Sequence, residues 1–300
     1  MTQENILPDY ISELLEDGTL EDQTKVQSFE YETPEAGPTY ARLVEYIELG
    51  THERKAFKGK EKAPAPKVRL TFELLGKRHL KEITVGGVKK IVGQTISVTW
   101  DKIINEKSKF YKLLSRLQAA VPAKAQKTHM ATFLNEAVKC KIVHAEVGEG
   151  ADKKTYANID WDSIDAPMYQ DEDENLLPYK VPAATVPIKL FLFDKPNKAT
   201  WDSLFIDGER EVKDDKGNTK TVSKNFIQIQ ILSALNFSGS ALESLLITGG
   251  DMPDLSKEAD VPSHEEGEAE EAPAPAAKAK ATTKTTKSAA AAMADLGLVE

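Results

Sequence analysis

The chain has 300 residues, 40% hydrophobic and 29% charged, which is enough to bury one large core or two modest ones. Its single cysteine, Cys140, excludes an intrachain disulfide and a cysteine-rich zinc site, and suits a reducing cytoplasm. No apolar run approaches the roughly 20 residues of a membrane span, and the acidic start of the chain lacks the pattern of an export signal. We therefore expect a cytoplasmic protein that does not enter a membrane.

The net charge of −9 hides a strong segregation along the chain. Residues 1–40 hold ten acidic side chains and one basic side chain. Residues 41–145 hold 22 Lys or Arg against nine Asp or Glu, a balance of +13, and residues 146–262 hold 12 against 22. A basic block between acidic segments indicates a polyanionic partner, although such a charge pattern does not determine the fold.

The first half of the chain predicts mainly strands. Residues 40–49 alternate in polarity with the period of a strand, which places Tyr40, Arg42 and Tyr46 on an outer, aromatic and basic face. The Lys-rich residues 52–67 include two prolines and predict a long basic loop. Further strands are predicted at residues 68–74, 81–92 (a hairpin around two glycines), 95–100, 138–147 and 154–161.

Helices are predicted at residues 107–120 and 130–138, because apolar residues there recur at three- and four-residue steps. About five strands and a helix within roughly 120 residues are the inventory of an oligonucleotide-binding-type barrel, which we expect at residues 39–164. The expected fold class is α+β and mainly β, with helices inserted in the barrel.

The rest of the chain predicts smaller units. Acidic residues 165–185 predict a linker or a covering strap, and residues 165–250 as a whole predict an α+β extension. The elements expected in this extension are a strand at 186–193, a helix at 200–206, a hairpin at 212–222 and helices at 225–236 and 240–247. At the two ends, residues 1–38 predict an acidic leader with one short helix, and residues 251–300 a disordered acidic tail with an apolar tip.

Aromatic side chains are interleaved with the positive charges of the basic block. Single-stranded DNA is held by basic grooves along its phosphates and by aromatic faces on which its bases stack. Four aromatic residues fall on apolar stripes and are expected in the core: Phe72, Trp100, Phe110 and Phe133. The candidate nucleic-acid-binding residues are Tyr40, Arg42, Tyr46, Arg54, Lys55, Phe57, Lys58, Lys60, Lys62, Arg69, Lys107, Lys109, Tyr111, Lys112 and Arg116.

Signals for catalysis or metal binding are weak. The five histidines show no pair at the spacing of metal ligands on one helix face. Asp160 and Asp162 would share a strand face, as in a cation-dependent nuclease, but no third carboxylate follows in a recognisable pattern. The glycines near residue 86 lack the ending of a phosphate loop, and residues 214–218 lack the ligands of a calcium loop. We expect no enzyme activity, no cofactor and no metal site.

Four short segments carry a resemblance when they are taken in order and spacing: ARLVEYIELGT (41–51), KVRLTFE (67–73), EKSKF (106–110) and KTYANI (154–159). They resemble a family of tailed-bacteriophage proteins, encoded near replication and recombination genes and thought to bind single-stranded DNA. The resemblance implies an oligonucleotide-binding barrel, action in phage DNA replication or recombination in the host cytoplasm, and a tail that recruits replication or recombination proteins. The alternative is a phage structural or adaptor protein whose basic block binds an acidic protein partner.

Overall fold

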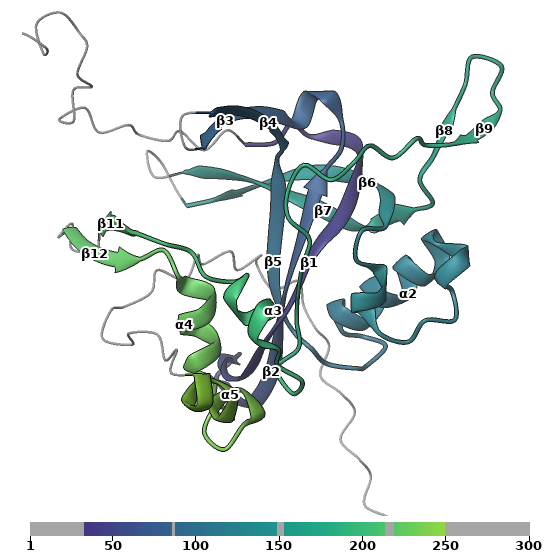
Figure 1. Cartoon of the computed structure of the whole chain (residues 1–300). Coiled ribbons are helices and arrows are strands. Elements are labelled where there is room, and N and C mark those ends of the chain that lie inside the picture. The colour runs from purple at the N-terminus through teal and green to yellow at the C-terminus, as the bar shows by residue number, and fades with distance from the viewer. Residues whose placement is uncertain (1–32, 86–87, 149–152, 214–218, 250–300) are drawn as a thin grey trace, which may run out of the picture. The chain divides into compact units, whose positions relative to one another are not determined.

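The computed structural model describes residues 33–85, 88–148, 153–213 and 219–249 (Figure 1). All of them lie within the compact unit Met1–His264. The predicted N-terminal helix, the predicted tail and residues 214–218 lie outside the described residues. None of the described helices is both long and apolar enough to cross a bilayer.

The described part of the chain is mainly β, with short helices between the strands. The first elements are β1 (Gly37–Phe57), β2 (Lys60–Leu74), β3 (Leu80–Val85), β4 (Val88–Gly93), β5 (Thr95–Asp101), α2 (Lys109–Ala120), β6 (Ala137–Val147) and β7 (Lys154–Asp165). They are followed by β8 (Met168–Gln170), β9 (Leu176–Pro178), β10 (Lys189–Phe191), α3 (Lys198–Asp202), β11 (Glu209–Lys213), β12 (Thr219–Ser223), α4 (Phe226–Leu232) and α5 (Ala241–Gly249).

The main sheet is antiparallel in the order β5–β2–β1–β6–β7, and β10 joins β1 in parallel. β6 pairs with the start of β1, and β10 pairs with its middle, where Tyr46 lies opposite Leu190. The expected mainly β class is thereby confirmed, as are the strands and helix predicted for β3 to β7 and α2. The second predicted helix, at residues 130–138, is wrong: a 3₁₀ turn at Met130–Phe133 leads directly into β6.

The predicted basic loop at residues 52–67 is also wrong, because these residues extend β1 and β2 into one long hairpin. A two-residue turn closes it, with positive φ at Lys58 (50°) and Gly59 (75°), as the tightest hairpin turns require. Proline lacks an N–H group and is tolerated where one side of a strand has no partner. Pro64 and Pro66 meet that condition, because β2 pairs with β5 only from Lys67 onward.

One hydrophobic core lies between the main sheet and α2. Apolar residues of α2 recur on one face and pack against the strands, and this core also contains Met130 and Phe133. The aromatic residues predicted to be core are confirmed there: Phe72, Phe110 and Phe133 are buried, and Trp100 packs against them.

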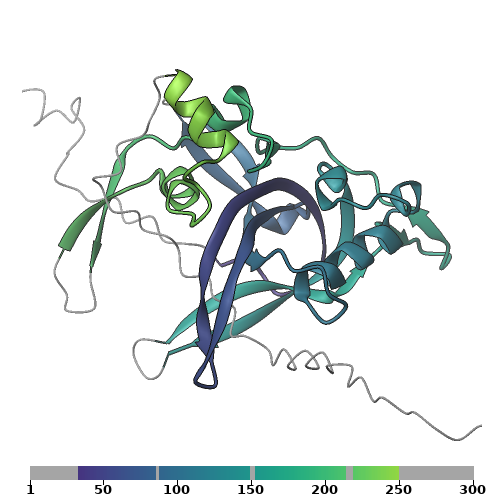
Figure 2. The same cartoon turned by 90° about the horizontal axis from the view of Figure 1, so that it is seen from below.

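A second core covers the opposite face of β1. Ile47 and Leu49 of β1 pack with Phe191, Trp201 and the apolar faces of α4 and α5. Figure 2 shows the β1–β2 hairpin between α2 and these C-terminal helices. Both faces of β1 are therefore buried from Ala41 to Gly50, with only Glu45 half-buried, and the predicted outer face of this strand is wrong.

The segment after β9 covers the sheet as a strap, the second of the two predicted alternatives. The Tyr179 ring stacks on that of Tyr40, with centroids 3.8 Å apart. The backbone N–H and the hydroxyl of Thr185 both donate to Glu73 Oε1, at 2.8 and 2.5 Å. The other carboxylate oxygen of Glu73 pairs with Arg42 at 3.4 Å, and Arg42 also donates to the carbonyl of Pro182. The strap thus completes a buried polar cluster on the sheet.

Candidate nucleic-acid interface

Exposed basic side chains gather at the end of the β1–β2 hairpin. Residues 53–62, here called the basic tip, hold five Lys or Arg against two Glu. Lys55, Lys58 and Lys60 are exposed and Lys62 is half-buried. Because a tight turn holds the two strands together, these charges are presented on regular structure.

The base of this hairpin is tied to β5 and to the loop that leads into α2. The Arg54 Nε lies 2.6 Å from Asp101 Oδ2, and the backbone N–H of Lys102 donates to the Pro66 carbonyl at 2.7 Å. The Lys102 ammonium pairs with the buried Glu48 at 2.8 Å. The basic tip and the start of α2 therefore lie at the same end of the sheet, and Arg54 is partly neutralised.

Helix α2 presents its basic residues on the face opposite its buried one. The helix begins after Ser108, whose hydroxyl accepts from the Tyr111 N–H at 3.2 Å and donates to the Ile103 carbonyl at 2.6 Å. With Phe110 and its helical neighbours facing the core, Lys112 and Arg116 are exposed. The sequence period of α2 thus decides which of its side chains can meet a ligand.

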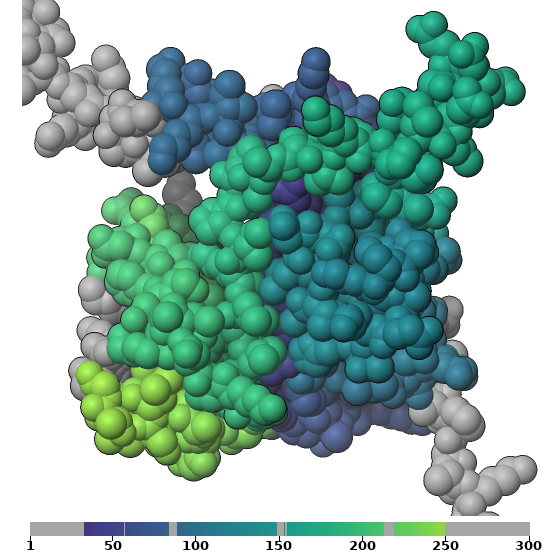
Figure 3. Space-filling view, turned by 45° about the vertical axis from the view of Figure 1, so that its right-hand side comes forward, coloured from purple at the N-terminus to yellow at the C-terminus, as the bar shows by residue number. Residues whose placement is uncertain are grey.

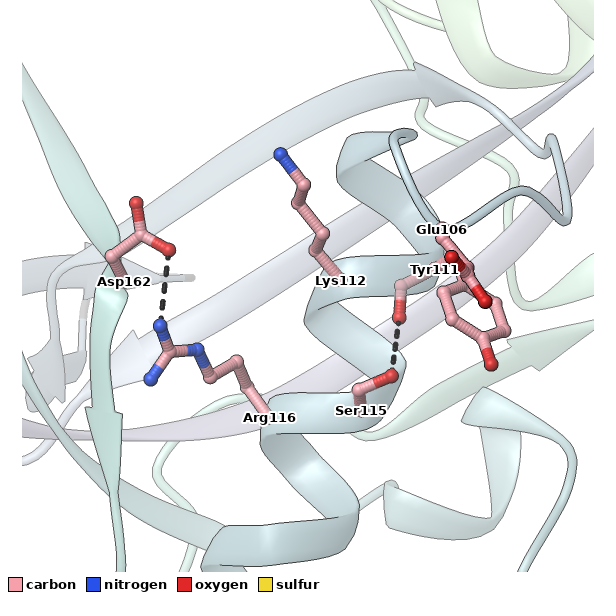
Figure 4. Close-up of a pocket in the computed structure, with 6 residues that line it drawn as sticks. All are labelled: Glu106, Tyr111, Lys112, Ser115, Arg116 and Asp162. Atoms are coloured by element: carbon pink, nitrogen blue, oxygen red, sulfur yellow. Dashed lines mark hydrogen bonds and ion pairs between the residues drawn. The ribbon is translucent and has the colours of Figure 1, made fainter.

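A cleft of about 330 Å³ opens between α2 and β7 (Figure 4). Its lining consists of Glu106, Tyr111, Lys112, Ser115, Arg116 and Asp162. Figure 4 shows Arg116 reaching toward Asp162 on β7, and their closest atoms are 3.2 Å apart. The volume is at the lower end for small-molecule sites. The two basic side chains, Lys112 and Arg116, are matched by two acidic side chains, so the lining as a whole carries no net charge.

Two of the predicted binding residues are buried, which corrects their assignment. The Tyr46 side chain is 0% exposed and its hydroxyl donates to Glu48 Oε1 at 3.2 Å. Burial first, and the Glu48 carboxylate second, raise the pKa of Tyr46. Arg42 is 2% exposed and is paired with Glu73. The strap covers Arg42, whereas Tyr46 lies in the first core beside the ring of His129, so neither side chain is presented to a nucleic acid.

Two more predicted residues are engaged within the protein. Arg69 is 17% exposed, its Nε lies 3.8 Å from Glu45, and its guanidinium lies 5.3 Å from the centre of the Phe226 ring. Burial lowers the pKa of Arg69. Tyr40 is covered by Tyr179, and its hydroxyl donates to the Met168 carbonyl at 3.0 Å. These contacts anchor the C-terminal region rather than leave a surface for phosphates or bases.

The remaining predicted residues fall into two groups. Phe57 ends β1, but its side chain lies outside the described part. On the basic tip lie Arg54, Lys55, Lys58, Lys60 and Lys62, and at or just before α2 lie Lys107, Lys109, Tyr111, Lys112 and Arg116. Three other residues line the cleft and are not among the predicted binding residues, because a basic block in a sequence points only to Lys and Arg: Glu106, Ser115 and Asp162.

Asp160 and Asp162 do not form a metal site with a third ligand. The Asp160 carboxylate accepts from the backbone N–H of Asp162 at 3.2 Å, and Asp162 faces Arg116. Within residues 33–249, apart from the short gaps in the description, no group of three or more metal-ligating side chains occurs.

Comparison with known proteins adds no relative: no family model, no curated protein and no solved structure matches the chain.

Proposed function

We propose that this protein binds single-stranded DNA, without sequence preference and without enzymatic activity, in phage DNA replication or recombination. The observation that carries the proposal is the basic tip, which presents exposed lysines on an ordered hairpin. Lysines arranged in this way neutralise phosphates and release counterions, which supplies most of the affinity in non-specific binding.

The outer face of α2 supplies the second half of the proposed interface. Lys112 and Arg116 offer charge for the phosphates, and the half-buried Tyr111 offers an aromatic ring on the same helix, pointing away from these two side chains (Figure 4). Stacking of a base on such a ring contributes about 1 to 3 kcal/mol and needs an unpaired base, which favours single strands over duplex.

The sheet is consistent with the oligonucleotide-binding-type barrel that we propose for this region. Five antiparallel strands form one side of the core under α2. The two strands at the ends of the sheet approach each other through Trp100 of β5 and Trp161 of β7, whose ring centres are 4.8 Å apart. Barrels of this type bind single strands across their strands and loops.

A salt titration with a labelled oligonucleotide tests the proposal. We expect the full-length protein to bind a single strand more tightly than its duplex, and log affinity to fall linearly with log salt, by about 0.7 per phosphate contact. Equal affinity for single strand and duplex contradicts the proposal. Competition by polyglutamate as effective as that by the oligonucleotide would favour the adaptor protein instead.

A tip-reversed variant (Lys58→Glu, Lys60→Glu and Lys62→Glu together) tests whether the DNA binds at the basic tip. Its affinity should fall at least tenfold at about 0.1 M salt, with a shallower salt slope. The matched control reverses three exposed lysines on the β3–β4 side: Lys77→Glu, Lys81→Glu and Lys90→Glu. Equal losses in the two variants would mean that net charge, and not the basic tip, determines the affinity.

A further inference from the structure

The β8–β9 hairpin is a second projecting element, with the opposite charge. Its tip holds four consecutive acids, residues 171–174, next to exposed apolar side chains. Tyr169 is 42% exposed and Leu176 67% exposed. Figure 3 shows the hairpin standing out from the surface at the upper right. Residues 168–178 are here called the acidic hairpin.

The acidic hairpin is held in a defined conformation. At its base, the Met168 carbonyl accepts from Tyr40, and the Tyr179 N–H donates to the Pro167 carbonyl at 2.7 Å. At its tip, the Asp171 carboxylate accepts from the backbone N–H groups of Asn175 and Asp173 at 2.8 and 3.0 Å. Hydrogen bonds from Asn175, the largest cause, lower the pKa of Asp171. The negative charges are therefore displayed on an ordered turn.

The acidic hairpin and the basic tip are attached to opposite ends of β1. Tyr40 contacts the base of the acidic hairpin near the start of the strand, and Phe57 ends the strand at the basic tip. At about 3.3 Å per residue, the strand between them follows a path of roughly 55 Å. Both Figures 1 and 2 show the β8–β9 hairpin projecting away from the β1–β2 turn. Within one molecule, the two complementary charges are thus kept apart.

We propose that the acidic hairpin of one molecule binds the basic tip of a second copy. The four acidic side chains of the hairpin would face a basic tip that has five basic and two acidic side chains. The apolar Leu176 and Leu177 can pack on the exposed Ala63 and Pro64 beside the tip. Two acidic hairpins would repel each other, so the contact joins unlike surfaces. Unlike surfaces that do not close a ring build open chains of molecules.

The contact depends on exposed charges, so it is weak and sensitive to salt. Such charges are screened beyond about 10 Å at 0.1 M salt and beyond about 3 Å at 1 M. Sedimentation of the full-length protein without DNA should give a mass that rises with concentration at low salt. Near 1 M salt the mass should return to that of the 33.0 kDa monomer. A monomer at all concentrations in low salt overturns the proposal.

Two charge-reversed variants give the decisive test. The first is the tip-reversed variant defined above, and the second is Glu172→Lys, Asp173→Lys and Glu174→Lys, with Asp171 kept because it organises the turn. Each variant alone carries two like-charged surfaces and should remain monomeric at low salt. An equimolar mixture should associate again, because each variant supplies the surface that the other has lost.

The mixture also shows that both variants are folded, since only folded surfaces restore the contact. Reversal of Lys77, Lys81 and Lys90 should leave association unchanged. Association of either variant alone at the wild-type level, or a mixture no heavier than its components, overturns the proposal. DNA is absent from these experiments, so their failure leaves the proposed binding of single strands untouched.

Discussion

The inner half of β1, residues 37–49, and its outer half, residues 50–57, contain similar side chains and use them differently. In the inner half, Arg42 is buried against Glu73 and Tyr46 is buried against Glu48. In the outer half, Lys55 is exposed on the basic tip. A basic strand in a sequence is therefore evidence for a ligand surface only where no other element covers it.

The largest effect is expected from the buried pair of the inner half. Replacing Glu73 by Ala leaves Arg42 buried without its acid and removes the acceptor of Thr185. The free energy of unfolding should fall by about 3 to 5 kcal/mol, measured by urea denaturation. The double replacement Arg42→Met and Glu73→Leu should cost less, because it leaves no unpaired buried charge. Equal losses in the single and double variants would contradict the burial of this pair.

The boundary between the two halves is Gly50, which has a φ of +82°. A Cβ there would lie 2.5 Å from the Cβ of Ala234 and 2.8 Å from the Phe193 ring. Gly50→Ala combines a left-handed backbone with overpacking, which together cost about 2 to 4 kcal/mol. Gly59→Ala is the control: its φ is +75°, but no atom lies within 4 Å, so only the backbone cost of about 1 to 2 kcal/mol applies. If the two replacements lower the free energy of unfolding equally, the second core does not pack closely against β1 at Gly50.

Local patterns predicted most of the strands correctly. The hairpin of β3 and β4, the strands β5 to β7 and the helix α2 follow from alternation, glycine turns and a three- to four-residue period. The extension of β1 and β2 through residues 52–67 was missed, because lysine and proline are poor strand formers. Pairing of the two strands with each other, in a two-stranded extension of the sheet, outweighs that preference here.

The candidate site was only partly predictable, because burial depends on distant segments. Arg42 is covered by the strap, whose Pro182 comes 140 residues later in the chain, and Tyr46 is buried in the first core, which α2 and Met130 complete. One signal was available: residues 41–49 are apolar at most positions, and such a run indicates a strand buried on both faces. The pairing of Arg116 with Asp162 had no sequence signal, because α2 and β7 are brought together only by the fold.

A smaller effect concerns pH. Burial holds the pKa of Tyr46 above its ordinary value of 10.0, so the stability gained by keeping this phenol neutral is complete below pH 10 and is lost as the pH rises further. We expect the unfolding free energy of the wild type to decline above pH 10 more steeply than that of Tyr46→Phe. At neutral pH, Tyr46→Phe should cost about 1 kcal/mol for the lost hydrogen bond to Glu48. If the unfolding free energies of the two proteins decline equally with rising pH, the Tyr46 hydroxyl is exposed to water and the assigned burial is wrong.

The smallest effect is expected in the cleft, where Asp162 is 86% exposed and faces an Arg116 that is 46% exposed. Such a pair contributes little to stability, so Asp162→Asn should leave the melting temperature unchanged. It also removes one of the two acids that balance the cleft, and Arg116 then becomes available to a phosphate. Affinity for a single strand should rise about two- to threefold at low salt and not at all near 1 M salt. The exposed Asp207, replaced by Asn, is the control for net charge. If both variants bind alike, the cleft lies off the path of the DNA and the interface is confined to the basic tip. A selective gain for Asp162→Asn would extend the interface from the outer half of β1 onto α2.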